Sequence, residues 1–207
     1  MKDIFIIGSG GFAKELHFLI REIGGFVIKA FVDKESSEPI EVGGLLTPVI
    51  GEVELENHKG SSIAFGIGDP NVLLKLSKKF KDNFLFPNLI HSNVIADWNG
   101  IKIGEGNIIC SGVNFTTDIV IGSYNIFNLC CTVGHDTIIG NGNVFNPGSN
   151  ISGGINIKDG VLIGTNATIL QYKKVGSNAV IGAASLVIKD VDNNSIVVGV
   201  PAKPISK

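Results

Sequence analysis

One pattern dominates the second half of the chain, because an apolar residue recurs there at every sixth position. From residue 103 to residue 187, all fifteen of these positions hold isoleucine, valine or phenylalanine. They are Ile103, Ile109, Phe115, Ile121, Phe127, Val133, Ile139, Phe145, Ile151, Ile157, Ile163, Ile169, Val175, Ile181 and Val187. An α-helix repeats every 3.6 residues and cannot hold a strict period of six on one face. A stack of short parallel strands can, because each strand points one apolar residue inward.

The residues between these positions suit such a stack. Four positions after each apolar residue the side chain is mostly small or polar. Glycine and asparagine suit the positive φ angles that the corners of such a stack need. Three hexads per turn make a coil of 18 residues, and Ile-Gly pairs at 103, 121 and 139 keep that interval. The fifteen positions therefore predict a β-solenoid of five coils. A β-sandwich would instead alternate with a period of two.

Residues 1–90 show a different pattern, in which strand and helix signals alternate. Apolar runs predict strands over residues 3–7, 26–32 and 62–67, and helical spacing predicts helices over 12–23 and 71–80. Gly24-Gly25 would end the first helix, and Asp69-Pro70 would begin the second. We therefore expect a small Rossmann-like α/β domain over residues 1–90, and a solenoid domain with a C-terminal tail over residues 91–207.

Composition excludes several classes of function. The net charge is −2 and Arg21 is the single arginine, so the chain has no general attraction for nucleic acid. No apolar run approaches the ~18 residues of a membrane span, and the N-terminus resembles a strand more than a signal peptide. Cys110, Cys130 and Cys131 form neither a disulfide framework nor a metal-ligand pattern. We expect a cytoplasmic protein with no nucleic-acid partner, no membrane insertion and no metal.

A glycine-rich turn follows the first expected strand and opens the first expected helix. Its sequence is Gly8-Ser9-Gly10-Gly11-Phe12-Ala13. Such a turn lets the backbone approach a phosphate, which the helix N-terminus then favours. Asp33 ends the second expected strand, where an acid would bind a ribose hydroxyl. Taken alone, this pattern is typical of NAD binding, although 90 residues are few for a complete dinucleotide fold. A glycine turn without a ligand is the plainer alternative.

Of the four histidines, only His135 lies inside the regular repeat. It follows the inward Val133 by two positions, so its side chain should point outward or lie at a corner. Gly153, one coil later, has no side chain and should leave room for a ligand. A histidine can accept a proton at neutral pH, and the carboxylate of Asp136 could support it. On these residues alone, a general base and an exposed histidine without a role both stay open.

Several segments resemble one family in their order along the chain. They are Ile7-Gly8-Ser9-Gly10-Gly11-Phe12-Ala13, Asp33, Gly66-Ile67-Gly68-Asp69, Gly134-His135-Asp136-Thr137-Ile138-Ile139-Gly140 and Val198-Gly199-Val200-Pro201-Ala202-Lys203. They look like the hexapeptide-repeat acyltransferases, which fold as left-handed parallel β-helices. Within these they match the nucleotide-sugar and sialic-acid acetyltransferases, typified by enzymes that acetylate UDP-4-amino-4,6-dideoxy sugars. The resemblance implies a homotrimeric, acetyl-CoA-dependent N-acetyltransferase that acts on a nucleotide-linked amino sugar in surface glycan biosynthesis.

The resemblance also implies roles for individual residues. His135 would be the general base, Asp136 would raise its basicity, and the backbone N–H of Gly153 would bind the oxyanion. Acetyl-CoA would lie between neighbouring β-helices near Val144, Gly153, Thr165 and Gly182. The nucleotide sugar would contact Gly8, Gly10, Gly11, Phe12, Asp33, Lys34, Gly68 and Asp69. The family often has histidine where Phe12 and Val144 stand, which puts a side-chain contact of Val144 with CoA in doubt.

Other functions stay open at this point. One is an O-acetyltransferase acting on a sugar or sialic acid, and another is a non-catalytic β-solenoid scaffold. A solenoid carbonic anhydrase would need three histidines around zinc, whereas the repeats supply His135 and the distant His91. The identity of the sugar, the choice among UDP, GDP and dTDP, and the choice between N- and O-transfer are equally open.

Overall fold

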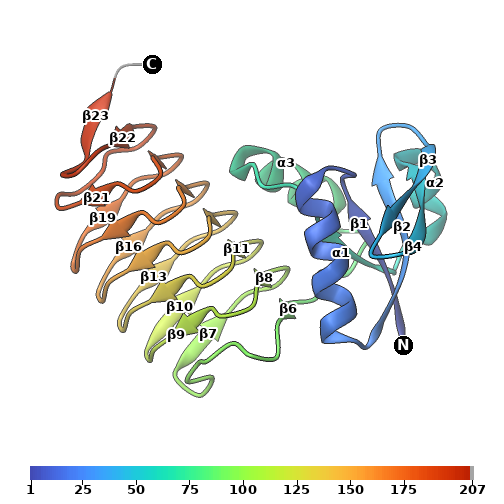
Figure 1. The fold of residues 1–207 in the computed structure, drawn as a ribbon, viewed down its shortest axis with the longest axis horizontal. Coiled ribbons are helices and arrows are strands. Elements are labelled where there is room, and N and C mark those ends of the chain that lie inside the picture. The colour runs from blue at the N-terminus through green and yellow to red at the C-terminus, as the bar shows by residue number, and fades with distance from the viewer. Residues whose placement is uncertain (206–207) are drawn as a thin grey trace.

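In the computed structural model, which describes residues 1–205, the first half of the chain forms a five-stranded sheet in the order β3-β4-β2-β1-β5 (Figure 1). The strands are β1 (Lys2–Ile7), β2 (Phe26–Asp33), β3 (Ser37–Val42), β4 (Leu45–Gly51) and β5 (Ser62–Phe65). All run parallel except β3, which pairs antiparallel with β4. The helices are α1 (Gly11–Ile23), α2 (Glu52–Leu55), the 3-10 helix η1 (Glu56–His58) and α3 (Pro70–Phe80). None of them is long and apolar enough to cross a membrane.

Local sequence signals explain where these helices begin and end. Gly24 ends α1 with a φ of 71°, a left-handed conformation that glycine adopts without strain. The Asp69 carboxylate begins α3 by accepting hydrogen bonds from Asn71 N and Val72 N at 2.8 and 3.2 Å. The hairpin of β3 and β4 was not expected, and it turns at Gly43-Gly44, where both φ angles are positive.

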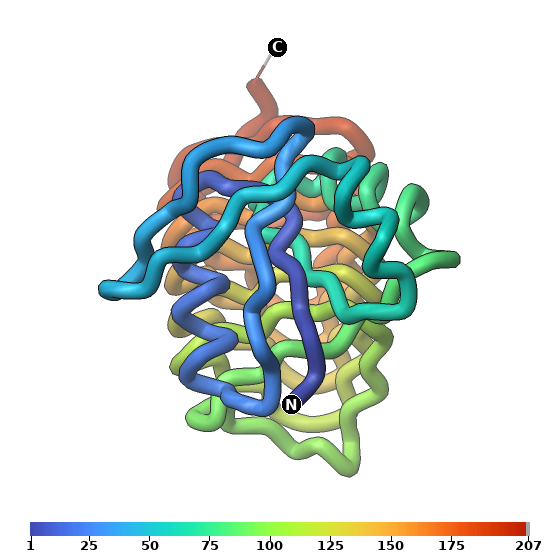
Figure 2. Tube along the Cα trace, turned by 90° about the vertical axis from the view of Figure 1, so that its right-hand side faces the viewer, coloured from blue at the N-terminus to red at the C-terminus, as the bar shows by residue number. Residues whose placement is uncertain are grey.

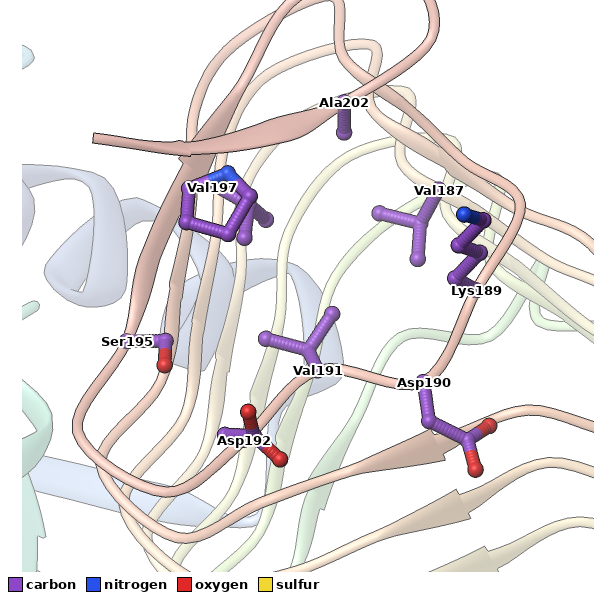
Figure 3. Close-up of a pocket in the computed structure, with 9 residues that line it drawn as sticks. Val187, Lys189, Asp190, Val191, Asp192, Ser195, Val197 and Ala202 are labelled. Atoms are coloured by element: carbon purple, nitrogen blue, oxygen red, sulfur yellow. The ribbon is translucent and has the colours of Figure 1, made fainter.

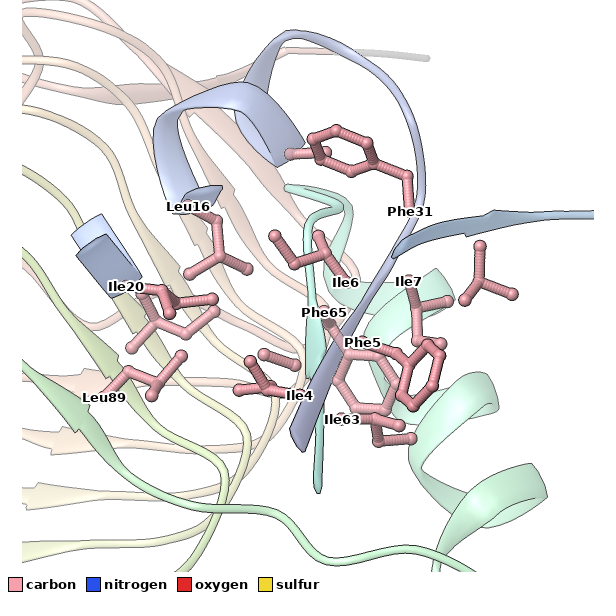
Figure 4. Packing of buried hydrophobic residues seen from close by; sticks show 14 of the residues in the cluster. Ile4, Phe5, Ile6, Ile7, Leu16, Ile20, Phe31, Ile63, Phe65 and Leu89 are labelled. Atoms are coloured by element: carbon pink, nitrogen blue, oxygen red, sulfur yellow. The ribbon is translucent and has the colours of Figure 1, made fainter. Parts of the chain in front are cut away.

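The core of the first half centres on β1, which is covered on both faces. Ile4, Phe5, Ile6 and Ile7 are all buried, which is why this strand is a continuous apolar run (Figure 4). Leu89, from the start of the second half, lies in the same cluster. The buried cluster of the first half therefore extends into the second half.

The second half is a parallel β-helix with three sheets, which we name after their early strands. The β7 sheet holds β7 (Ile101–Ile103), β10 (Ile119–Ile121), β13 (Ile138–Ile139), β16 (Asn156–Ile157) and β19 (Lys174–Val175). The β8 sheet holds β6 (Leu89–Ile90), β8 (Ile108–Ile109), β11 (Ile126–Phe127), β14 (Val144–Phe145), β17 (Leu162–Ile163), β20 (Val180–Ile181), β22 (Ile196–Val198) and β23 (Lys203–Ile205). The β9 sheet holds β9 (Asn114–Phe115), β12 (Thr132–Val133), β15 (Asn150–Ile151), β18 (Thr168–Ile169) and β21 (Leu186–Val187). The predicted coil of 18 residues is confirmed, since Phe127 pairs with Phe145 and Val133 with Ile151.

The repeat positions fill the inside of this β-helix as predicted. Fourteen of the fifteen are at most 3% exposed, and Ile103 at the open end is half-buried. At the corner between the β7 and β8 sheets, the polar residues that lie four positions after the inward residues also form hydrogen bonds. There Asn107, Asn125 and Asn143 are buried, and each side-chain oxygen accepts a hydrogen bond from a backbone N–H one coil further on, at 2.7–2.9 Å. Buried amides are thus satisfied within the stack.

The α/β half lies across one side of the coil stack (Figure 2), and it packs against the β8 sheet. The outward residues Ile108, Ile126 and Val144 of that sheet belong to the same buried cluster as α1 and β1. The β-helix also begins earlier than the expected position 91, because Leu89–Ile90 already pairs with β8. Backbone bonding explains this early start, since Leu89 N donates to Asn107 O at 2.8 Å.

Candidate active site

His135 lies at the corner between the β9 and β7 sheets, on residues 134–137 between β12 and β13. In a flat strand its neighbour Asp136 would face the other way. Asp136 instead has a φ of 57°, and this left-handed turn brings the two side chains together. His135 Nδ1 and Asp136 Oδ2 are 2.7 Å apart. With Nδ1–H donating to the carboxylate, Nε2 is left to accept a proton from a substrate.

Gly153 lies one coil beyond His135 and touches its ring. A Cβ at this position would stand 2.5 Å from His135 Nε2 and 2.7 Å from Cε1. The room that the sequence led us to expect for a ligand above Gly153 is therefore taken by the imidazole, because the ring folds back onto the glycine. Within residues 1–205 the Gly153 N–H donates no hydrogen bond. A free amide beside the base can stabilise an oxyanion.

A cavity of about 280 Å³, which we call the interdomain cavity, lies between α1 and the β8 sheet. Its lining residues are Phe12, Glu15, Gly68, Ile126, Asn128, Val144, Asn146 and Pro147. The structure thus brings Phe12 and Gly68, expected at the sugar, together with Val144, expected at acetyl-CoA. Val144 is only 1% exposed, because it packs against the α/β half. The sequence did not point to Glu15, Asn128 and Asn146, because nothing in it tells which face of α1 meets the β-helix.

The expected acetyl-CoA residues fall on two different corners of the β-helix. Thr165 and Gly182 lie on the corner between the β8 and β9 sheets. In an earlier coil, the same corner borders the interdomain cavity. Asn166 N donates to Pro147 O at 3.0 Å, and Ala184 N donates to Thr165 O at 2.8 Å, so these corner residues stack coil upon coil. Gly153 lies instead on the His135 corner. One chain therefore does not bring Gly153 close to Thr165 and Gly182.

A second cavity, of about 330 Å³, lies at the carboxyl ends of β1 and β2, and we call it the sheet-edge cavity. Gly8, Asp33 and Lys34, three of the residues expected at the nucleotide, line it. Ser9 Oγ donates to Asp33 Oδ2 at 2.5 Å, and Lys34 N donates to Oδ1 at 2.8 Å. These two hydrogen bonds, that of Ser9 above all, lower the pKa of Asp33. Asp33 is thus a fixed carboxylate at neutral pH.

The far wall of the sheet-edge cavity carries charges that we did not predict. Lys75 and Lys79 of α3 line it together with Glu52, and Lys79 Nζ lies 2.5 Å from Glu52 Oε2. The spacing of four residues between the two lysines on a helix was the available sequence signal, since it puts both on one face. Together with Lys34 they outnumber the two carboxylates of the cavity, Asp33 and Glu52, so the cavity carries a net positive charge.

The glycine turn lies between the two cavities and leaves the start of α1 open. Cβ atoms at Gly10 and Gly11 would meet nothing within 4 Å, and no side chain caps the helix. Its first backbone N–H groups are therefore available to an anion. Gly8 has a φ of 102° and lies so close to Ile67 that only glycine suits this position. Asp69 lines neither cavity and its carboxylate caps α3, so its contact with the nucleotide sugar stays a prediction.

The base and the glycine turn of one chain lie far apart around the β-helix. In a three-sided coil, the corner of the β9 and β7 sheets is the one opposite the β8 sheet. The β8 sheet is covered by the α/β half of the same chain. His135 therefore faces away from the glycine turn that precedes it in the sequence.

A smaller cavity of about 150 Å³ lies at the C-terminal end of the β-helix (Figure 3). Val187, Val191, Val197 and Ala202 are among its lining residues, and none of the expected site residues is. Ala202 N donates to Leu186 O at 2.7 Å, so the tail folds over the last coil. The tail thus covers the end of the β-helix, as expected.

Comparison with known proteins gives matches to both halves. The PglD N-terminal domain matches residues 3–80. A serine acetyltransferase of Buchnera aphidicola is 30% identical over 202 residues, and the alignment covers 93% of this chain and 62% of that protein. The chain thus spans less than two thirds of the length of that relative.

Solved structures match over the whole length. PerB of Caulobacter crescentus, in complex with CoA and GDP-perosamine, has a TM-score of 0.90 and 28% identity, covering 100% of this chain and 98% of PerB. The acetyltransferase domain of PglB from Neisseria gonorrhoeae, in complex with acetyl coenzyme A, has a TM-score of 0.89 and 27% identity, with 99% of each chain covered. The predicted Rossmann-like half followed by a left-handed β-helix is confirmed. With a PglD-type first half and a second half like the β-helix of these enzymes, the chain is similar over its whole length to hexapeptide-repeat nucleotide-sugar acetyltransferases.

Proposed function

We propose that the protein transfers the acetyl group of acetyl-CoA to the amine of a nucleotide-linked 4-amino-4,6-dideoxyhexose. The observation that carries this proposal is the imidazole of His135, held at Nδ1 by Asp136 and packed against Gly153, where a side chain would not fit. PerB, which is similar over its whole length, was solved with CoA and GDP-perosamine. The family resemblance supports a role in surface glycan biosynthesis. The free thiols of Cys110, Cys130 and Cys131 suit a cytoplasmic enzyme.

The two cavities and the glycine turn form a track for the nucleotide sugar. The base and ribose would occupy the sheet-edge cavity beside Asp33 and Lys34. The diphosphate would lie at the open start of α1, at Gly10 and Gly11. The amino sugar would then enter the interdomain cavity next to Phe12 and Gly68. This direction brings the reacting amine to the β8 sheet.

A second copy of the chain must supply the base to this site, because His135 lies opposite the β8 sheet of its own chain. We therefore propose a homotrimer in which the His135 corner of one copy faces the interdomain cavity of its neighbour. Acetyl-CoA would lie in the groove between them, along Thr165 and Gly182 of one copy and Gly153 of the other. The two predicted halves of the acetyl-CoA site then meet across the interface.

The geometry suits a direct acetyl transfer. His135 Nε2 accepts a proton from the sugar amine while the nitrogen attacks the thioester carbonyl carbon, forming the C–N bond. The N–H of Gly153 stabilises the oxyanion of the tetrahedral intermediate, and Asp136 stabilises the imidazolium. The C–S bond then breaks, and the CoA sulfur leaves with the proton that His135 returns. The products are the N-acetyl sugar and free CoA.

The activity is tested by following CoA thiol release with acetyl-CoA and three acceptors. These are GDP-perosamine and the UDP- and dTDP-linked 4-amino-4,6-dideoxyglucoses, with sialic acid and the 4-hydroxy counterparts as comparisons. We expect steady turnover with at least one of the three amino sugars. Turnover with sialic acid or a hydroxy sugar alone would establish O-transfer and refute the proposal.

The shared site is tested by mixing two inactive chains. Asp33→Ala removes substrate recognition and His135→Ala removes the base, so each variant alone should be nearly inactive. If each site takes its cavity from one chain and its base from the next, random co-assembly restores roughly a quarter of the sites. Co-refolding the pair should therefore raise activity well above either variant. Activity no higher than the mean of the two would place both functions in one chain.

A further inference from the structure

We infer that Glu15 is a specificity-determining residue, which selects a protonated amine on the acceptor sugar from inside the interdomain cavity. The inference rests on the proposed function. It concerns which acceptor binds, and leaves the proton transfer to His135.

Glu15 is the one ionisable side chain among the eight residues that line this cavity. The others are apolar, glycine or carboxamide side chains. Glu15 lies three residues after Phe12 on α1, so both side chains share the face that meets the β8 sheet. Within residues 1–205 no lysine, arginine or histidine forms an ion pair with it. The cavity thus presents one carboxylate without a counter-charge.

The neighbouring thiol of Cys110 supports the placement of the Glu15 carboxylate beside the β8 sheet. Cys110 is buried where the β8 sheet meets α1. Its pKa is raised to about 12, mainly by burial and further by the charges of Cys131 and Glu15. The Glu15 carboxylate thus lies close enough to the β-helix to raise the pKa of Cys110. It lies on the side from which the sugar amine would meet the base.

The chemistry of the acceptors gives this carboxylate a consequence. A sugar amine binds as an ammonium group, which a carboxylate attracts and hydrogen-bonds strongly. A hydroxyl group at the same carbon carries no charge, and the carboxylate of a sugar acid would be repelled. Glu15 therefore favours amino sugars over both alternatives at the binding step. One ammonium proton then leaves to solvent before His135 accepts the second.

The test compares Glu15→Gln with the wild type, using whichever of the three nucleotide amino sugars the wild type acetylates. Because a hydrogen bond to a charged group is worth more than a neutral one, we expect the KM of the amino sugar to rise about tenfold. We expect kcat to stay within about threefold, since the base is intact. The inhibition constant of the 4-hydroxy counterpart should not change. Glu22→Gln, on an exposed position two turns along α1, is the matched control and should behave as wild type.

Each outcome decides the inference. An unchanged KM for the amino sugar in Glu15→Gln, with an active wild type, would overturn it while leaving the proposed function intact. Equal weakening of the amino sugar and its hydroxy counterpart would also overturn it, because Glu15 would then bind the sugar ring and not its charge. A wild type that acetylates none of the three amino sugars would overturn the proposed function itself, and with it this inference.

Discussion

Replacing Gly153 by alanine tests whether the imidazole of His135 works in the position that the structure gives it. The added Cβ would stand 2.5, 2.7 and 2.9 Å from three atoms of the ring. Non-bonded heavy atoms settle at about 3.5–4.0 Å, so the ring must retreat by about 1 Å. The backbone of Gly153 is not left-handed, so alanine strains only this contact.

The cost should appear in catalysis and not in stability. More than half of the His135 side chain is exposed, so the ring can swing outward without disturbing the core. That movement breaks the 2.7 Å contact with Asp136 and carries Nε2 away from the amine. A misplacement of 1 Å can cost about 100-fold in rate, so we expect kcat to fall by about that factor. The KM values for both substrates and the melting temperature should change little.

The assay is steady-state release of the CoA thiol, with thermal unfolding measured alongside. Gly51→Ala is a suitable control, because its Cβ would meet nothing closer than 3.5 Å. In a His135→Ala background the ring is gone, so Gly153→Ala should add less than about threefold. A kcat for Gly153→Ala within threefold of wild type would refute the reasoning. So would an undiminished 100-fold effect in the His135→Ala background, which would assign the whole loss to the Gly153 amide.

Three further predictions concern individual hydrogen-bonded side chains. His135→Ala should lower kcat by roughly 10²–10⁴-fold with little change in either KM, and Asp136→Asn should cost less, as steady-state kinetics would measure. Ser9→Ala removes the hydrogen bond that most lowers the pKa of Asp33, so the carboxylate should protonate at a higher pH. On acidification the KM of the nucleotide sugar should then rise earlier than in wild type, which a pH series would reveal. Asn125→Leu should destabilise the β-helix by about 3 kcal/mol or more in denaturant unfolding, because the buried amides of Asn143 lose their acceptor.

Sequence alone was sufficient for the β-helix because every coil repeats the same physical requirement. Each strand must bury one side chain in a narrow interior, so residues such as Phe127 and Phe145 recur at a fixed interval and stack with ring centroids 4.5 Å apart. No long-range information is needed to see this. The caps of α1 and α3 were similarly local, because Gly24 and Asp69 act on their own helices.

Contacts between the halves were harder to predict, because they depend on which surfaces meet. The interdomain cavity with Glu15 belongs to this class. One sequence signal was nevertheless present. The outward residues of the β8 sheet are apolar at 18-residue intervals, as in Ile108 and Ile126, whereas those of the first four strands of the β9 sheet are the polar residues Asn114, Thr132, Asn150 and Thr168. When the residue directly before each inward residue is also apolar, the outer face of that sheet is expected to be covered by another part of the protein. Here the α/β half covers the outer face of the β8 sheet.

The pairing of His135 with Asp136 follows from the same regularity. The residue three positions after each inward residue has a positive φ along most of the β-helix. From residue 106 to residue 184 these residues are Gly106, Gly112, Asp118, Tyr124, Cys130, Asp136, Gly142, Gly148, Gly154, Gly160, Asn166, Tyr172, Asn178 and Ala184. Most are glycine, asparagine or aspartate, the types that adopt this conformation at least cost. Asp136 thus has the positive φ that almost every residue at this corner position has. This turn brings the side chain of the preceding residue, His135, to the same side of the backbone as that of Asp136. A catalytic pair therefore needs no special backbone in this fold, only histidine and an acid at two neighbouring corner positions.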